Sequence, residues 1–549
     1  MKIKKAGIGC LSSLLVIILG VWLLSLSLHI APPAVSDIHQ LADKEATTTD
    51  KGERIFNGCF LRQSDSGIWE MYLKGNAFDR GIAAGKLEKE LLKYQEDVFI
   101  DQIKKIIPSE FYLKFLRIFI GIFNRNLASD IPEELKEEIY GLSLSCTHEY
   151  DYIGSPYERQ LNYHAAHDLG HAMQDYHLVG CTSFAAWNEA TDDSTLLIGR
   201  NFDFYVGDDF AKNKTLTFYA PETGYKFVSV GWAGMIGVLS GMNEKGLTVT
   251  INAAKSSIPL ASATPISIVC REILQYASTV EEAQKIAAKR KLFVSESILV
   301  GSAIDNSAII IEKSPEKTGV YQSSGNWLVC ANHFQSETFR NDKRNLENIR
   351  TSDSPYRQQR MEELILRNLP LNPVKAAAIL RNKEGLSDTN IGLGNEKSIN
   401  QLIAHHSVIF KPKQKQIWVS TAPWQLGAYV CYDLNKIFNS PDFSSEIKTE
   451  QLTIAPDAFL KTHEYSEFIF YREYRKRLKT IIHKKETANE EDLTRFIHSN
   501  PELYSVYKLV GDYYASQKQT SQAIEYWKQA LEKEIPTLNE KEAIQRKIQ

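Results

Sequence analysis

The stretch from His177 to Phe204 constrains the fold of this chain more than any other segment. It reads HLVGCTSFAAWNEATDDSTLLIGRNFDF, in which Cys181 opens a β-type run between a glycine and a hydroxyl residue. The motif G-R-N-x-D follows about eighteen residues later and contains Arg200 and Asp203. Neither half is specific alone, but together they form a signature that centres on the Cys181 thiol.

The sequence pattern upstream of Cys181 is helical. Between residues 87 and 146, apolar side chains recur at helical spacing, and the segments KLEKELLKYQEDVFIDQIKKII and PEELKEEIYGLSLS are predicted to be amphipathic helices. Residues 111–124, FYLKFLRIFIGIFN, are interpreted as a buried helix, with an interfacial membrane helix as the alternative.

The sequence pattern downstream of Cys181 is that of short strands with turn signals between them. The runs are CTSFAAW, TLLIGRNFDF, LTFYAP, KFVSVGW, GVLSGMNEKGLTVTINAA, SAIIIEK, GVYQSS, NWLVCANHF, HSVIFKP and QIWVSTAPW. Helices are expected near residues 267–289 and 354–368. Strand clusters that alternate with paired helices indicate layered sheets faced by helices.

Length and composition describe a folded, multi-unit protein. At 549 residues the chain exceeds what one hydrophobic core organises, which predicts two to four structural units. Hydrophobic residues at 43% and charged residues at 24% are ordinary globular values, so a disordered or fibrous chain is excluded. A net charge of -3 gives no basic field for a polyanion, and no nucleic-acid partner is expected.

The N-terminus has the pattern of a membrane anchor. Three lysines precede an uncharged, mostly apolar run from Ala6 to about Leu28, and roughly 20 such residues span a bilayer. The positive-inside rule keeps the lysines cytoplasmic and places the chain after Ser36 outside the cytoplasm, in the periplasm or at the cell surface. A cleavable signal peptide is the alternative, but the apolar run exceeds the usual length of about 7 to 15 residues and no clear A-x-A site follows.

The cysteines carry little other information. Seven are widely spaced without a C-x-x-C pair, so the sequence shows neither a zinc knuckle nor a thioredoxin-type pair. An odd number in an exported protein leaves at least one thiol unpaired. Most are interpreted as buried small hydrophobes, and only Cys181 has a context that indicates chemistry.

The C-terminal region differs from the rest. Residues 507–535 carry five small or aromatic residues at the spacing of a tetratricopeptide repeat, a helix pair of about 34 residues: Gly511, Tyr514, Ala523, Trp527 and Ala530. One repeat cannot bury its own faces, so we expect it to cap neighbouring helices or to dock on the rest of the protein. The alternative is a separate array that holds a protein partner.

The signature at Cys181 resembles that of the N-terminal-nucleophile hydrolases of the choloylglycine hydrolase and penicillin V acylase type. It is still closer to the autoproteolytic isopenicillin N acyltransferase (acyl-coenzyme A:6-aminopenicillanic acid acyltransferase) family. Further motifs agree in order: GMNEKGL at 241–247, CANHF at 330–334 and SPYRQQR at 354–360. Upstream, GNAFDRGIAAG at 75–85 resembles the glycine-rich start of that family's pro-region. The resemblance spans roughly residues 75–433.

The resemblance implies an α+β fold, an αββα sandwich with a helical pro-segment before it. The tetratricopeptide-like helices expected after it follow from the residue spacing in 507–535 and not from the resemblance. The units expected are an anchor (1–33), a linker (34–53), the helical pro-segment (54–180), the catalytic domain (181–440) and a helical region (441–549) with one repeat at about 507–540. The catalytic domain would then lie outside the cytoplasm.

The resemblance also implies that the protein cuts its own Gly180–Cys181 bond. The freed α-amino group, with a pKa near 7.7 to 8.0, can accept the proton of a thiol whose ordinary pKa is near 8.5. While that amine is still an amide it cannot act as a base, so activity must await cleavage. Gly180 suits the cleaved position because a residue without a side chain tolerates a strained backbone.

Roles for five further residues follow from the resemblance alone. Asp203 would orient the new ammonium and Arg200 would favour the thiolate. The side-chain amide of Asn332 and the backbone N–H of Asn252 would stabilise the tetrahedral oxyanion. Arg357 matches the family arginine close to the nucleophile. Neither a cofactor nor a metal is expected.

Each residue also has a structural interpretation. Arg200 and Asp203 could form a surface ion pair, Asn332 could be a turn residue and Arg357 an exposed helix arginine. A papain-like protease would use Cys181 and His333, but the papain-type signature around the cysteine is missing.

A metal site is the other rival, because the helical segment HAAHDLGHAMQDYH spaces His164, His167 and His171 by three and four residues. No H-E-x-x-H motif accompanies these histidines, which favours a structural role.

The expected reaction is hydrolysis of a linear, non-peptide amide such as an N-acyl amine or N-acyl amino acid. Attack of the Cys181 thiol on the amide gives an acyl-enzyme thioester that water resolves. Acyl transfer to an amine acceptor is the alternative. A further alternative is a membrane-bound helical scaffold whose catalytic body is inactive.

Overall fold

The computed structural model describes residues 29–35, 41–106, 120–125, 127–173, 180–255, 262–439 and 446–549. The predicted anchor run and most of the segment 111–124 lie outside the described residues, as do the side chains of His167 and His171. Among the helices that the structure describes, none is both long enough and apolar enough to cross a bilayer.

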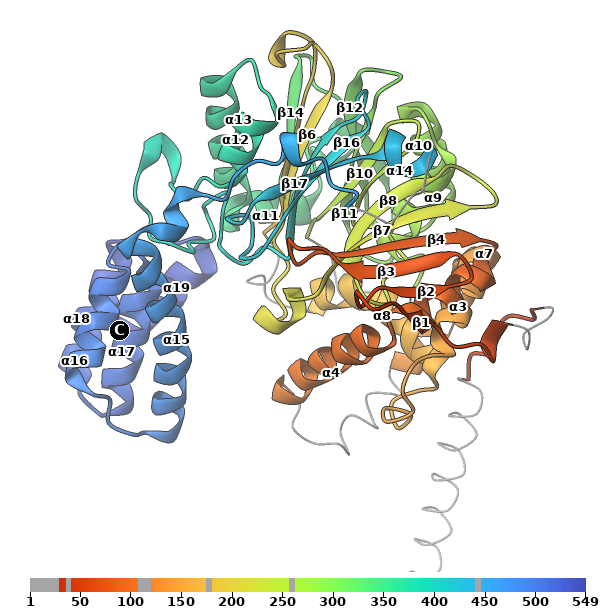
Figure 1. The fold of residues 1–549 in the computed structure, drawn as a ribbon. Helices are drawn as coiled ribbons and strands as arrows, with labels where there is room; N and C mark the ends of the chain where they lie inside the picture. The colour runs from red at the N-terminus through yellow and green to blue at the C-terminus, as the bar shows by residue number, and fades with distance from the viewer. Residues whose placement is uncertain are drawn as a thin grey trace, which may run out of the picture.

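The larger sheet has eleven strands in the order β1-β2-β3-β4-β7-β8-β9-β10-β11-β12-β13 (Figure 1). Neighbouring strands are antiparallel except β4 and β7, which pair in parallel. Their bounds are β1 (Thr47–Thr48), β2 (Arg54–Phe56), β3 (Cys59–Gln63), β4 (Trp69–Gly75), β7 (Lys214–Pro221), β8 (Phe227–Trp232), β9 (Ser240–Asn243), β10 (Leu247–Ala253), β11 (Glu296–Ser302), β12 (Ser307–Lys313) and β13 (Thr318–Tyr321).

The smaller sheet has six antiparallel strands in the order β14-β5-β6-β15-β16-β17. Their bounds are β5 (Thr182–Ala186), β6 (Leu197–Phe202), β14 (Trp327–Cys330), β15 (His406–Lys411), β16 (Gln416–Ser420) and β17 (Tyr429–Asp433). Because side chains alternate across a strand, Ile198 of β6 faces the other sheet whereas Leu197 faces away from it.

The two sheets pack face to face with helices on both outer faces (Figure 1). The outer face of the larger sheet packs on α3 (Ala77–Leu87), α4 (Lys89–Ile106), α7 (Glu133–Ser143), α8 (Pro156–Met173), α9 (Ile266–Tyr276) and α10 (Val280–Lys289). The outer face of the smaller sheet packs on α12 (Ser354–Asn368) and α13 (Pro373–Leu380). These four layers confirm the predicted α+β class.

The expectation that residues 54–180 form a purely helical pro-segment is wrong for their first part. Residues 54–75 form β2, β3 and β4 at one side of the larger sheet. Apolar side chains there repeat every second residue: Tyr72 packs in the core between the sheets, whereas Met71 and Leu73 pack under the outer helices. The segment is therefore half of a sheet layer as well as a helical layer.

The strand runs predicted downstream of Cys181 coincide with strands of the structure. The structure adds β11 and β17, which the sequence pattern missed, because ESILVGS and YVCYD are short apolar runs without clear turn signals. The helix expected near 267–289 is two helices, α9 and α10. They separate at Ala277, after which Thr279 caps the second helix through Glu282.

Five helices at the C-terminus form a bundle beside the sheets (Figure 1). They are α15 (His463–Lys484), α16 (Glu490–Ser499), α17 (Tyr504–Ser516), α18 (Thr520–Leu531) and α19 (Leu538–Ile548). A Cβ at Gly511 would lie 2.5 Å from the Trp527 ring, so the small residue lets α17 and α18 approach. That this pair is a tetratricopeptide repeat stays a prediction.

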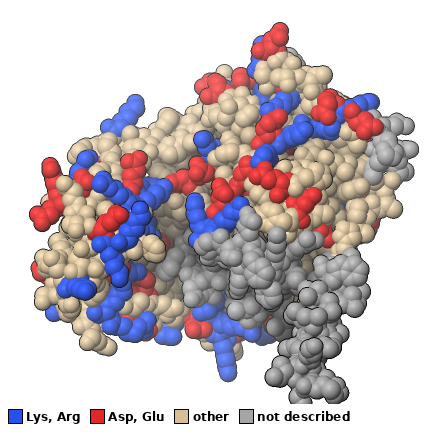
Figure 2. All heavy atoms as spheres, turned by 90° about the horizontal axis from the view of Figure 1, so that it is seen from below, with Lys and Arg blue, Asp and Glu red and all other residues tan. Residues whose placement is uncertain are grey.

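The bundle is joined to the rest of the molecule. Its core includes Leu393, Leu402 and Leu426, which come from the loops before β15 and β17. Basic side chains gather on the part of the lower face that the bundle occupies (Figure 2). Among the basic residues of α15, Arg472 and Lys476 both contact Asp208, which follows β6.

Candidate active site

The six residues predicted from the sequence converge where β5 begins. Cys181 directly precedes β5, Arg200 lies in β6 and Asp203 directly follows β6. Asn252 lies near the end of β10 in the other sheet, so the site sits between the sheets. The remaining two, Asn332 after β14 and Arg357 in the first turn of α12, approach from the opposite side.

The thiol of Cys181 lies next to a buried guanidinium. Arg200 Nη2 is 3.9 Å from the sulfur and also donates to the carbonyl oxygen of Ile251. Arg200 Nη1 donates 2.9 Å to the carbonyl oxygen of Leu239, so the side chain crosses from one sheet to the other. Burial raises the pKa of the Cys181 thiol to about 11, although Arg200 acts to lower it. In the uncut chain the thiol is therefore protonated at neutral pH.

The carboxyl group of Asp203 is buried and has no hydrogen-bond partner among the described residues. Burial raises its pKa to about 8, with Arg357 and Arg200 acting against that rise. Its backbone carbonyl oxygen accepts a hydrogen bond from the Gly180 N–H at 3.1 Å. Asp203 thus lies beside the predicted cleavage point with two carboxyl oxygens unsatisfied, which costs free energy unless a donor arrives.

Arg357 organises the backbone around Cys181. Its Nη1 donates to the carbonyl oxygens of Gly180 (3.0 Å) and Cys181 (2.9 Å) and to Thr182 Oγ1 (2.8 Å). Its Nη2 donates to Asn332 Oδ1 at 2.8 Å. The side chain is fully buried, so the interpretation as an exposed helix arginine is wrong.

The two predicted oxyanion residues are engaged with other groups. Asn332 Nδ2 donates to the carbonyl oxygen of Ala253 at 2.8 Å, and Asn252 Nδ2 donates to that of Cys330 at 3.0 Å. Asn252 Oδ1 accepts from Ser183 Oγ at 3.1 Å. Both side chains therefore join the two sheets at the site, and their predicted roles at an oxyanion stay predictions.

Gln401 is a residue that the sequence analysis missed. Its Nε2 donates 3.0 Å to the carbonyl oxygen of Gly180, the same atom that accepts from Arg357. It lies in the irregular stretch before β15, in a part of the chain without a recognised motif, and nothing in the local sequence marks it.

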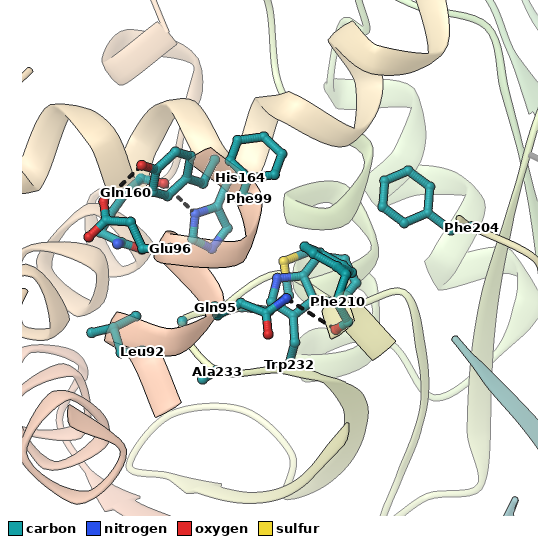
Figure 3. A pocket seen from close by; sticks show the side chains of 13 residues that line it. Leu92, Gln95, Glu96, Phe99, Gln160, His164, Phe204, Phe210, Trp232 and Ala233 are labelled. Atoms are coloured by element: carbon teal, nitrogen blue, oxygen red, sulfur yellow. Dashed lines mark hydrogen bonds between the residues drawn. The ribbon is translucent and has the colours of Figure 1, made fainter. Parts of the chain in front are cut away.

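A cavity of about 60 Å³ lies where the pro-segment meets the catalytic region. Helices α4 and α8 line one side, and the segments after β6 and β8 line the other (Figure 3). Gln95 Nε2 donates to the carbonyl oxygen of Phe210, which joins the two sides. Cys181 does not line the cavity. The Phe204 ring lies at the cavity edge and stacks on Phe202 at a centroid distance of 5.6 Å.

Two of the histidines named in the rival interpretations, His333 and His164, make other contacts. His333 Nδ1 contacts Ser354 Oγ at 2.7 Å, and no described hydrogen bond joins it to Cys181. His164 Nδ1 contacts the carbonyl oxygen of Gln160 at 2.7 Å, and its Nε2 accepts from the Ile236 N–H at 3.0 Å. With both nitrogens hydrogen-bonded, His164 is a structural residue.

Comparison with protein families confirms the predicted resemblance. Residues 187–423 match a family described as acyl-coenzyme A:6-aminopenicillanic acid acyl-transferase. The match contains Arg200, Asp203, Asn252, Asn332 and Arg357, and it begins just after Cys181.

Two curated relatives share parts of the chain. Protein dcd1B of Dictyostelium discoideum is 27% identical over 270 residues, which cover 46% of this chain and 51% of that protein. An uncharacterized protein of Archaeoglobus fulgidus is 24% identical over 297 residues, 50% of this chain and 49% of that protein. The chain spans about half the length of the curated relatives it matches.

Solved structures similar to this chain include three enzymes. They are a Caenorhabditis elegans ortholog of N-acylethanolamine-hydrolyzing acid amidase (18% identity, 42% of this chain, 93% of that chain, TM-score 0.30), a conjugated bile acid hydrolase from Clostridium perfringens (16%, 47%, 93%, 0.32) and a penicillin V acylase from Agrobacterium tumefaciens (17%, 47%, 87%, 0.30).

Proposed function

We propose, on the premise that residues 187–423 belong to the acyl-coenzyme A:6-aminopenicillanic acid acyltransferase family, that this protein is a self-cleaving amide hydrolase. Cutting the Gly180–Cys181 bond makes Cys181 the N-terminal nucleophile. The observation that carries the proposal is the buried Asp203 carboxyl, which has no hydrogen-bond partner in the described part of the chain and lies near a thiol that is itself next to Arg200.

The chemistry of the cut chain follows from these contacts. A free α-amino group at Cys181 supplies the donor that the Asp203 carboxyl lacks, and the pair stabilises both partners because each would otherwise be a buried unpaired group. The amine can then take the thiol proton, and Arg200 favours the thiolate by its charge. The thiolate attacks the carbonyl carbon of a bound substrate amide. The amine part of the substrate leaves with a proton, and water then hydrolyses the thioester.

The substrate that we propose is a linear, non-peptide amide with an apolar acyl group. The cavity between α4, α8 and the segment after β8 supports this class because aromatic rings dominate its lining, among them Phe99, Phe210 and Trp232. An engineered cavity of about 150 Å³ holds benzene, so about 60 Å³ has room for two or three carbon atoms. Cys181 does not line this cavity, so an acyl group bound there reaches the thiol only if the side chains between them move.

Acyl transfer to an amine is the second candidate, because the matching family is described by a transferase activity. The two reactions share the thioester and differ in whether water or an amine reaches it first. Product analysis with and without an acceptor amine distinguishes them.

Two further proposals concern the whole chain. We propose that residues 6–28 anchor the protein in a membrane with the catalytic body outside the cytoplasm; this segment lies outside the described residues. We also propose that the C-terminal bundle supports the catalytic body rather than holding a protein partner, since Arg472 and Lys476 both contact Asp208 of that body.

The experiment compares the wild-type chain with Cys181→Ala. N-terminal sequencing of the purified protein should find a fragment that begins at Cys181 in the wild type and no such fragment in the variant. The wild type should release amine from fatty-acyl, phenoxyacetyl or bile-acid amides, and the variant should not. Equal cutting of both chains overturns self-cleavage, and a wild-type chain that stays uncut and inactive favours the scaffold.

A further inference from the structure

We propose that Gln401 is a catalytic residue of the self-cleavage step and that the C-terminal bundle holds it over the cleaved bond. This inference rests on the proposed function and concerns the first event in the life of the enzyme, before any substrate binds. It assigns a task to the buried Gln401 side chain and specifies how the C-terminal bundle supports the catalytic body.

Two donors converge on the carbonyl oxygen that must become an oxyanion. Gln401 Nε2 and Arg357 Nη1 each lie 3.0 Å from the Gly180 oxygen. Paired donors aimed at one oxygen are the usual way in which a protein stabilises a tetrahedral intermediate, and removing one such donor costs about 10²- to 10³-fold in rate. The donors are in place in the uncut chain, so no rearrangement is required before attack.

The cleavage step balances as follows. The Cys181 sulfur bonds to the Gly180 carbonyl carbon while the carbonyl π electrons move to the oxygen, which Gln401 and Arg357 stabilise. The carbon–nitrogen bond then breaks, and the nitrogen gains the proton that the thiol lost. Water hydrolyses the resulting thioester, giving a Gly180 carboxylate, the free thiol and the free amine.

Gln401 also explains the glycine at the cleaved position. A Cβ built on Gly180 would lie 2.2 Å from Gln401 Nε2, far inside van der Waals contact. Any larger residue would push the amide away from the carbonyl oxygen. The glycine is therefore required by its partner across the fold, 221 positions along the chain.

The loop that carries Gln401 is fastened to the C-terminal bundle at three points. Leu393 exchanges two backbone hydrogen bonds with the side chain of Asn500, at 3.0 and 2.8 Å. Asn395 Nδ2 donates 2.9 Å to the carbonyl oxygen of Glu534. At the residue after Gln401, the carbonyl oxygen of Leu402 accepts from Arg472 Nη1 at 3.0 Å.

The backbone beside Gln401 needs this support. Leu402 has a φ of +55°, a left-handed conformation that costs a non-glycine residue free energy. Its side chain is buried in the core of the bundle, where burial offsets that cost. The bundle thus fixes the backbone that aims Gln401 at Gly180.

The first test measures the cleavage rate of full-length chains after cell-free synthesis. Gln401→Ala and Gln401→Glu should slow the appearance of the Cys181 N-terminus by about 10²-fold or more. The alanine side chain has no hydrogen-bond donor, and an ionised glutamate side chain has none either. The matched control is Gln425→Ala, which removes another buried glutamine amide, one that donates to the Leu380 carbonyl oxygen away from Gly180. That control should be cut at the wild-type rate.

The second test addresses the bundle. Arg472→Ala removes the contact with Leu402 and should slow cleavage by about 10-fold. Arg477→Ala, on the same helix, removes an ion pair with Asp492 and a cation–π contact with Tyr474, both within the bundle, and should leave the rate unchanged. Equal rates for these two variants overturn the role of the bundle.

Folding is checked by placing Gln401→Ala and Gln401→Glu in the Cys181→Ala chain, which cannot cut itself, and comparing thermal midpoints. Where one variant does not fold, the other decides. Wild-type cleavage in a folded Gln401 variant overturns this inference and leaves the proposed function intact. Cutting of Cys181→Ala itself overturns the proposed function instead.

Discussion

At the scale of single residues, the site is a set of buried polar groups that the proposed cut would complete. Among the residues that the structure describes, the Asp203 carboxyl has no hydrogen-bond partner, and burial raises its pKa to about 8. The Cys181 thiol has its pKa raised to about 11 by the same cause. Both groups are neutral in the uncut chain at pH 7, so the precursor avoids burying two negative charges near each other.

The raised pKa of Asp203 predicts a pH-dependent stability of the uncut chain. The folded state keeps the proton up to about pH 8, whereas the unfolded state loses it near the ordinary carboxyl pKa of 3.8. The contribution is therefore fully present below pH 4 and is lost as pH rises towards 8. The free energy of unfolding of the Cys181→Ala chain should therefore fall by on the order of a few kcal/mol over that range. The Cys181→Ala/Asp203→Asn chain should not show this fall.

Chemical denaturation at pH 5 and pH 8 measures this difference. The cut wild-type chain is the control, because its new ammonium pairs with the Asp203 carboxylate and lowers that pKa. Identical pH profiles for the two uncut chains would contradict the assignment of Asp203.

Arg357 offers a second prediction at this scale. Its planar guanidinium contacts Gly180, Cys181, Thr182 and Asn332 at once, and a lysine ammonium cannot reproduce that fork. Arg357→Lys should therefore slow self-cleavage by about 10²-fold or more, measured by the yield of the Cys181 fragment over time. Arg360→Lys in the same helix is the control, because its partners Asn382, Glu363 and Asp388 lie away from the cleaved bond. If the Arg357→Lys chain is cleaved at the wild-type rate, Arg357 has no role in self-cleavage.

At the scale of secondary-structure elements, close packing of two helices explains the glycine-rich segment 75–85. A Cβ at Gly81 of α3 would lie 2.0 Å from the carbonyl oxygen of Glu138 in α7, and one at Gly141 would lie 2.5 Å from that of Phe78. The two backbones are therefore in contact. A Cβ at Gly85 would likewise meet the backbone of Leu142. Gly81, Gly85 and Gly141 thus lie along one seam, the line of contact between α3 and α7.

Gly81→Ala should separate α3 from α7. Although alanine favours a helix over glycine by about 1 kcal/mol, the clash with a backbone oxygen can be relieved only by moving a helix, which costs about 1 to 3 kcal/mol or more. We expect the thermal midpoint of the Cys181→Ala chain to fall by on the order of 5 °C. Gly231→Ala, whose Cβ meets only Met235 at 3.5 Å, is the control, and an equal effect of both changes would refute the seam.

How far the sequence alone predicts the fold also depends on the element. The runs after Cys181 are short β-type segments separated by turn signals and become strands, and the order of motifs placed Cys181, Arg200, Asp203 and Arg357 in one site. The strands β2 to β4 were missed because helical periodicity further along dominated the pro-segment. Gln401 could not be found, because its contact with Gly180 joins loops far apart in the chain, which no local pattern encodes.

At the scale of the whole molecule, the proposed cut would not divide the protein into two bodies. The parallel pair β4 and β7 joins a strand before Cys181 to a strand after it over seven residue pairs, Trp69–Gly75 against Thr215–Pro221. The larger sheet therefore continues across the cleavage point. We expect the two fragments to co-elute in size-exclusion chromatography and to separate only in denaturant; two separate native peaks would contradict this continuity.

Glu138 forms a buried ionic link between the two proposed fragments, and its removal should weaken that link. Glu138 Oε2 accepts from Arg80 Nη2 at 2.6 Å and from Arg271 Nη2 at 3.0 Å, so one carboxylate of α7 neutralises a guanidinium from each side of the cut. All three side chains are buried.

Glu138→Ala leaves two buried cations without that partner, which should cost about 3 to 5 kcal/mol. In the uncut chain this lowers the thermal midpoint; in the cut chain it should also let the fragments separate at a lower urea concentration than in the wild type. Glu137→Ala, an adjacent helix residue without a described ion pair to the other fragment, should change neither value. Fragment separation at the same urea concentration in both variants would show that the sheet alone holds the cut protein together.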